Sequence, residues 1–181
     1  MTTLSTGPRS ANTLPRLSPV LLRAAVKVAP AAPAAPADRR LAGGRRVGMR
    51  QVIQDGPLGF TAIDAFALYD ACCYGGDYVR AQGQFMYVIL DVTNMSKRAR
   101  TFVADYQRLV DGDGRSYLPD LQTMSLTEGR FARRFADIDP GSTAHSLLLF
   151  DVPVGTTQND YRLALHSSAK PSTASVMLAR G

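Results

Sequence analysis

The chain has 181 residues and a formal net charge of +6, and its length suits one domain with an appendage and allows a substantial core. The charge is uneven, because residues 1–50 carry nine Lys and Arg against the single acid Asp38, a net +8, whereas the other 131 residues carry 12 basic and 14 acidic side chains, a net −2. We therefore do not expect specific nucleic-acid binding by the folded domain.

Residues 1–46 are rich in Pro, Ala, Ser and Arg, and Pro recurs every third position within residues 29–37. Such a composition favours extended, polyproline-like chain, so we predict a disordered tail or spacer over residues 1–46. Residues 14–28 resemble a degenerate secretory signal that Arg23 and Lys27 interrupt; a transit peptide and a wrongly assigned start codon are the alternatives. No run approaches about 18 consecutive apolar residues, so we expect no transmembrane span.

From Val47 onward, short apolar runs alternate with turn residues. We predict a first strand at residues 49–53, a turn at 55–57, a second strand at 58–68 with a bulge near Ala62, and a loop at 69–82. Residues 83–94 give the strongest strand signal, because from Met86 every second side chain is apolar while Asp91 and Thr93 point the other way. This pattern predicts a long central strand in an antiparallel sheet with one buried face.

After a turn at residues 94–98, we predict a strand at 101–110, a hairpin turn at 111–114 and a short strand at 115–118. Residues 119–134 are weakly periodic and suit a loop or a short helical turn over the end of a sheet. The remaining predicted strands are 131–138, 144–152, 159–166 and 174–179, with a turn at 139–141. Their predicted core residues are Leu148, Phe150, Val152, Tyr161, Leu163, Leu165, Val176 and Leu178. Seven to nine short strands without a long helix predict an all-β, antiparallel β-sandwich at residues 47–181.

Several motifs stand in an order that resembles one protein family. They are residues 55–61, 83–94, 108–111, 114–117, 139–141, 150–153 and 161–163. Together, over residues 47–180, they resemble the immunoglobulin-like domain of unknown function of bacterial, often actinobacterial, secreted proteins and lipoproteins. That family is similar in architecture to the mycobacterial immunoprotective extracellular antigens. The resemblance implies an immunoglobulin-like sandwich, a linker after an export signal or anchor, and no established reaction.

The same resemblance bears on the cysteines. Actinobacterial members often pair a cysteine just before the central strand with one inside it. Here Cys72 or Cys73 takes the first position and Met86 the second, which implies that this disulfide is missing. From the residues alone, a bridge between adjacent cysteines needs strained geometry, and small buried hydrophobes are favoured over reactive or intermolecular thiols.

Catalytic and metal sites have weak support in the sequence. A cysteine hydrolase would combine Cys72 or Cys73 with His145 or His166, but both histidines lie in predicted strands and no nucleophile signature surrounds the cysteines. These two Cys and two His also lack the spacing of a zinc site.

Three further motifs have simple structural interpretations. Asp111 and Asp113 resemble the start of a calcium loop, although a hairpin turn explains them better because no Glu follows near the twelfth position. Arg130, Arg133 and Arg134 suit either an anionic polymer or a solvated strand edge. Residues 75–76 (Gly-Gly) are too short for a phosphate cradle. We therefore expect no catalytic residue, no cofactor and no metal site.

The sequence favours a non-enzymatic binding or interaction module of the bacterial cell envelope or secretome, with an unknown protein or envelope component as its partner. The alternative is an intracellular, cytoplasmic adaptor whose basic, Pro-rich tail contacts an acidic partner such as nucleic acid. An enzyme built on loop residues is a third hypothesis, because a fold does not determine a function.

Overall fold

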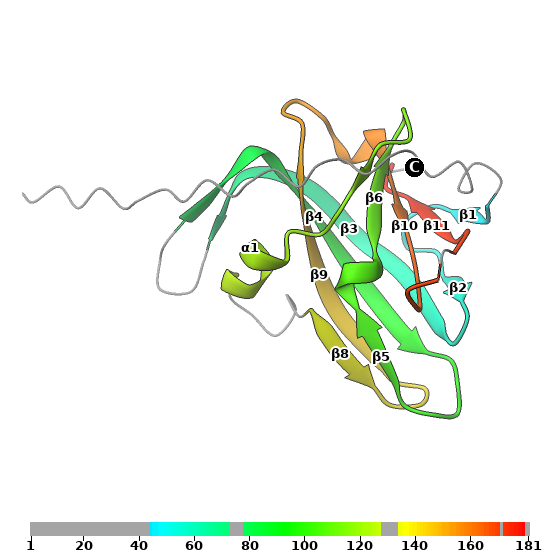
Figure 1. Cartoon of the computed structure of the whole chain (residues 1–181). Coiled ribbons are helices and arrows are strands. Elements are labelled where there is room, and N and C mark those ends of the chain that lie inside the picture. The colour runs from blue at the N-terminus through cyan, green and yellow to red at the C-terminus, as the bar shows by residue number, and fades with distance from the viewer. Residues whose placement is uncertain (1–43, 73–77, 128–133, 171, 180–181) are drawn as a thin grey trace, which may run out of the picture.

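The computed structural model describes residues 44–72, 78–127, 134–170 and 172–179 (Figure 1). The predictions for residues 1–43, Cys73, residues 75–76, Arg130 and Arg133 lie outside these ranges, as does the side chain of Cys72. No helix in the described part of the chain has the length and apolar character needed to cross a bilayer.

The described residues are mostly strands. The strands are β1 (Arg46–Val47), β2 (Ile53–Asp55), β3 (Leu58–Cys72), β4 (Tyr78–Asn94), β5 (Arg100–Val103), β6 (Arg108–Asp111), β7 (Ser116–Tyr117), β8 (Phe135–Ile138), β9 (Thr143–Val152), β10 (Tyr161–Ala164) and β11 (Ser175–Met177). The helices are α1 (Leu121–Leu126) and the 3-10 turns η2 (Ala104–Tyr106) and η3 (Gln158–Asp160). One sheet has the order β2-β3-β4-β9, a second has the order β1-β11-β10-β6-β7, and β5 pairs with β8.

The two large sheets enclose one apolar core. Met86, Val88 and Leu90 on the inner face of β4 have no exposed surface. Leu109 of β6 and Leu163 of β10, in the other sheet, belong to the same core cluster. Neighbouring strands pair antiparallel except β1 with β11. The molecule is therefore the antiparallel β-sandwich that the sequence predicted, and the buried face of its central strand is confirmed.

The first strand was placed wrongly. Of residues 49–53, only Ile53 belongs to a strand, because Arg50 has a φ of 62° and Gly48 N–H donates to the Gln51 side chain across a turn. Edge pairing begins earlier instead, at Arg46, one residue before the predicted start of the domain, where β1 pairs with β11.

The predicted loop at residues 69–82 was also wrong at both ends. β3 continues to Cys72 and β4 begins at Tyr78, so that the two strands pair as a ribbon beyond the rest of the sheet (Figure 1). Asp70 lies opposite Arg80 in this ribbon, and their side chains form an ion pair at 3.2 Å. The predicted bulge near Ala62 is confirmed by a register shift.

Several later predicted strands are shorter than expected, and those at 115–118 and 174–179 are reduced to β7 and β11. Residues 101–110 are split by η2, which sends β5 to pair with β8 and β6 into the other sheet. The strand predicted at residues 159–166 begins after η3 and ends at Ala164, so His166 lies in a loop. Its Nδ1 accepts a hydrogen bond from Ser172 N–H, which replaces the expected sheet pairing.

The turns were predicted more accurately than the strand ends. The hairpin between β6 and β7, the turn at residues 139–141 and a helical turn within 119–134, which is α1, are all confirmed. Asp120 accepts a hydrogen bond from Thr123 N–H at the start of α1, and its own N–H donates to Leu149 of the edge strand β9. The short helix is thereby attached to the side of the sheet.

Candidate functional site

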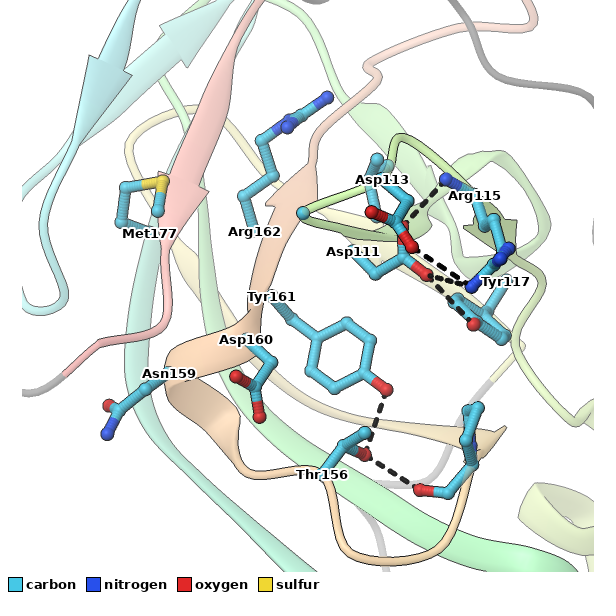
Figure 2. A pocket seen from close by; sticks show the side chains of 13 residues that line it. Asp111, Asp113, Arg115, Tyr117, Thr156, Asn159, Asp160, Tyr161, Arg162 and Met177 are labelled. Atoms are coloured by element: carbon cyan, nitrogen blue, oxygen red, sulfur yellow. Dashed lines mark hydrogen bonds and ion pairs between the residues drawn. The ribbon is translucent and has the colours of Figure 1, made fainter.

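A solvent-open cavity of about 540 Å³, lined by both polar and apolar groups, lies where the turn after β6, the loop after β9 and the start of β10 meet (Figure 2). This is the end of the sandwich opposite to β5 and β8 (Figure 1). Its lining contains three carboxylates and two guanidinium groups: Asp111, Asp113, Asp160, Arg115 and Arg162. Two phenols, Tyr117 and Tyr161, also contribute to it.

The β6–β7 hairpin forms one wall of the cavity. Its turn is closed by Gly114, whose φ of 84° suits glycine, and by hydrogen bonds from Arg115 N–H to Asp111 Oδ1 (2.8 Å) and from Asp111 N–H to the Arg115 carbonyl (3.0 Å). The Arg115 guanidinium lies 3.2 Å from Asp113 and 3.9 Å from Asp111. The hairpin therefore presents a charge network whose members neutralise one another in part.

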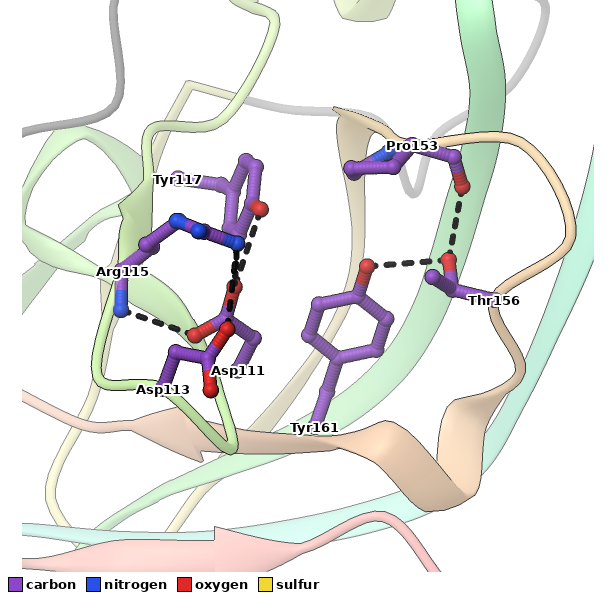
Figure 3. Close-up of polar contacts among 7 residues, drawn as sticks. All are labelled: Asp111, Asp113, Arg115, Tyr117, Pro153, Thr156 and Tyr161. Atoms are coloured by element: carbon purple, nitrogen blue, oxygen red, sulfur yellow. Dashed lines mark hydrogen bonds and ion pairs between the residues drawn. The ribbon is translucent and has the colours of Figure 1, made fainter.

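Tyr117 extends this network into the cavity. Its hydroxyl donates a hydrogen bond to Asp111 Oδ2 at 3.1 Å (Figure 3). Burial, reinforced by this bond and by the negative charge of Asp111, raises the pKa of Tyr117 to about 12. The phenol therefore stays protonated at neutral pH, and its oxygen lone pairs remain available as acceptors.

The opposite wall is the loop after β9. Tyr161 donates a hydrogen bond to Thr156 Oγ1 (2.9 Å), and the Thr156 hydroxyl donates to the Pro153 carbonyl (2.8 Å; Figure 3). Gln84 of β4 holds the same loop, because its amide donates to the Thr156 carbonyl and its Oε1 accepts from Gly155 N–H. The loop that shapes the cavity is thus attached to the central strand.

The two phenols connect the walls. The rings of Tyr117 and Tyr161 meet edge to face, with centroids 5.9 Å apart. Burial raises the pKa of Tyr161, and the negative charges of Asp111 and Asp160 add to that increase, although the Thr156 hydrogen bond opposes it. Both phenols are therefore uncharged at neutral pH, and Tyr161, which is 1% exposed, is almost completely buried.

Arg162 stands at the margin of the cavity beside Met177 (Figure 2). Burial lowers its pKa, the positive charge of Arg46 lowers it further, and Asp111 opposes the change. Its Nε is buried and has no hydrogen-bond partner among the described residues. With Arg162 counted, the lining carries three negative and two positive charges, a formal net charge of −1.

The calcium interpretation of Asp111 and Asp113 is not supported. Arg115 and Tyr117 contact these carboxylates, and no group of three His, Cys, Asp or Glu side chains in the described part of the chain is placed to hold a metal ion. The hairpin interpretation of this motif is the one that the structure confirms.

Of the pairs considered for a cysteine hydrolase, Cys72 and His145 lie far apart in the described part of the chain. Cys72 pairs with Tyr78, and His145 pairs with Asp91 on the same strand β4, which places the two about 43 Å apart along the strand at about 3.3 Å per residue. His145 Nδ1 instead lies 2.5 Å from an Asp91 carboxylate oxygen on an exposed sheet face. Arg134, the described member of the predicted basic cluster, forms a two-point ion pair with Asp105 (Nε to carboxylate oxygens, 2.8 and 2.9 Å).

Sequence reasoning missed most residues of the cavity. Arg162 and Thr156 gave no signal, and Tyr161 was assigned only to the core. Gln84 carried the one usable signal, because it is a polar residue on the same face of β4 as Met86 and is 4% exposed. A buried amide in an apolar strand needs hydrogen-bond partners, and here those partners are in the cavity loop.

The sequence of the chain matches one known protein family. A family model described as "Domain of unknown function (DUF4352)" matches residues 49–175. The chain belongs to this family. Among curated proteins nothing matches the chain. Membership of this family assigns no activity to the chain.

Solved structures resemble this DUF4352 sandwich at low sequence identity. A secreted protein from Mycobacterium tuberculosis, MPT63, is 17% identical, with 75% of this chain and 98% of that chain covered and a TM-score of 0.53. The yjhA protein from Bacillus subtilis is 16% identical, with coverages of 64% and 79% and a TM-score of 0.51. At these identities the likeness shows the β-sandwich fold alone.

Proposed function

We propose that this DUF4352 protein is a non-enzymatic binding module of the bacterial cell envelope or secretome, and that its ligand binds in the cavity formed by the β6–β7 hairpin, the loop after β9 and the start of β10. The observation that carries this proposal is the network of contacts in the cavity walls, where Asp111 is held by Arg115 and Tyr117, and Tyr161 is held by Thr156. Fixed donors and acceptors around a cavity are what recognition requires, because little ordering entropy is then lost on binding.

The same arrangement supports binding rather than catalysis. A general base or nucleophile needs a poised, reactive group, and the Asp111 carboxylate is already engaged by Arg115 and Tyr117. None of the described residues that line the cavity is a His or a Cys. The phenol pKa values are raised, which disfavours the phenolate that a Tyr nucleophile or base would need.

The proposed location rests on the resemblance to secreted bacterial domains and on the fold shared with a protein described as secreted. A Pro-rich spacer before the sandwich suits a domain held at some distance from its anchor or released from the cell. Subcellular fractionation of the native host, with mass spectrometry of the mature N-terminus, tests this location. Recovery of the protein solely with intact residues 1–46 in the cytoplasm would instead favour the adaptor.

The binding function is tested by sedimenting the full chain with cell envelopes isolated from the native host. Tyr117→Phe and Arg162→Gln should each reduce the bound fraction at least 5-fold, because they remove a polar group from the cavity. Arg100→Gln is the matched control, since Arg100 is exposed at the opposite end of the sandwich, where its side chain contacts Ser96. Equal binding by all three variants and the wild type would refute the assignment to this cavity.

A further inference from the structure

The groups that line the cavity also indicate the chemical class of ligand that it can bind. We infer that it accepts an uncharged, polyhydroxylated ligand, namely a saccharide unit, rather than an anion or an amine. This inference rests on the proposed function, because it specifies what binds at the site proposed there.

The charge distribution disfavours ions of either sign. An anion drawn to Arg115 would also approach Asp111 and Asp113, which lie 3.9 and 3.2 Å from its guanidinium nitrogen. A cation drawn to the carboxylates would meet the same guanidinium. Because the charges of the hairpin, Asp111, Asp113 and Arg115, already lie beside opposite charges, an ion entering there would lose its hydration without gaining an unpaired counter-ion. An uncharged ligand does not incur this cost.

The polar groups of the cavity match hydroxyls. A hydroxyl donates one hydrogen bond and accepts two, so it needs a lining that offers both acceptors and donors. The oxygen of Tyr117 already uses its proton on Asp111 and therefore acts as an acceptor towards a ligand (Figure 3). Arg115 and Arg162 supply donors on the hairpin side and at the margin (Figure 2). Adjacent hydroxyls of one sugar ring can use both kinds of group at once.

Apolar atoms and size agree with the same ligand class. Val110, Pro153 and Met177 line the cavity beside the polar groups and can contact the C–H face of a sugar ring. The volume of about 540 Å³ falls within the range of about 300–1,000 Å³ that is usual for sites of small organic ligands. The site is therefore large enough for a short saccharide segment.

The test uses pairs of oligosaccharides that share a backbone and differ in charge. The full chain is titrated calorimetrically with chitotetraose and its deacetylated, cationic tetramer, and with tetragalacturonate and its neutral methyl ester, within a panel of neutral hexose and pentose oligosaccharides. At least one neutral probe should bind, and its charged counterpart should bind at least 10-fold more weakly. Tyr117→Phe should weaken neutral binding at least 5-fold, whereas Arg100→Gln should not change it.

Each other result overturns the inference. Tighter binding of a charged member would assign the site to an anion or an amine, and neutral binding insensitive to Tyr117→Phe would place the saccharide elsewhere. Thermal melting of each variant separates loss of binding from loss of folding, and Arg162→Gln, which removes a charged donor at the margin of the cavity, is the second variant if Tyr117→Phe unfolds. Envelope sedimentation that depends on the cavity, without binding of any neutral saccharide, would refute this ligand class and leave the proposed function intact.

Discussion

At Gly83 the structure leaves no room for a single added methyl group. A Cβ at this position would lie 2.0 Å from the Val152 carbonyl oxygen, compared with about 3.3–3.6 Å for an ordinary close C···O contact. β4 and β9 must then separate locally by roughly 1.3 Å. That shift also disturbs the Asp151 carboxylate, which accepts hydrogen bonds from Gln82 N–H (2.8 Å) and Gly83 N–H (3.0 Å).

We expect Gly83→Ala to lower the free energy of unfolding by about 3–4 kcal/mol, from about 1–3 kcal/mol of overpacking and the weakened bonds to a charged carboxylate. At about 3 °C per kcal/mol for a domain of this size, the melting temperature should fall by roughly 10 °C. Because Val152 leads into the cavity loop, ligand binding should weaken as well. Urea denaturation and thermal melts measure the change.

The matched control is Gly112→Ala, because a Cβ at Gly112 meets nothing within 4 Å. Its free energy of unfolding should stay within about 0.5–1 kcal/mol of the wild type. If Gly83→Ala and Gly112→Ala melt at the same temperature, the close approach of β4 and β9 at Val152 is refuted.

Three further predictions concern the core, the pH response and the tail. Leu90→Asp should unfold the domain, because an unpaired carboxylate in this fully buried position costs several kcal/mol against a total of about 5–15, whereas Thr93→Asp on the other face should be tolerated; equal circular dichroism melts would contradict this. The folded chain holds the Tyr117 proton up to a pKa of about 12, so stability from this group should be complete below pH 10 and decline from pH 10 to 12; a Tyr117→Phe variant with the same decline in urea titrations would disprove it. Trypsin should cut at Arg40, in low-complexity chain, before Arg46, whose strand pairs with Ser175; early cleavage after Arg46, seen by mass spectrometry, would argue against β1.

The local sequence was sufficient to predict elements whose conformation depends on neighbouring residues in the chain. The alternation of Met86, Val88 and Leu90 identified the buried face of the central strand, because successive side chains of a strand point to opposite faces. The Asp-Gly-Asp-Gly turn after β6 was predictable for a similar reason, since its residues tolerate the backbone angles that a hairpin requires. Signals of this kind were sufficient to predict the sandwich and the approximate positions of most of its strands along the chain.

Tertiary structure alone decided where strands end and what lies beside them. β3 and β4 continue to Cys72 and from Tyr78 because they pair with each other beyond the sheet, and no local pattern marks that pairing. The 3-10 turn that divides residues 101–110 likewise reflects two different partners, β8 and β10, for the segments on either side.

The cavity depends on tertiary structure most strongly. Gln84 and Thr156 are 72 positions apart and Asp111 and Tyr161 are 50 apart, yet the first pair shares hydrogen bonds and the second pair lies opposite in register. A polar residue in the sequence shows which hydrogen bonds it can make but not which group will be within reach. Strand pairing and the close approach of β4 to β9 at Gly83 supply that information, because they fix the distances between segments that have no relation along the chain.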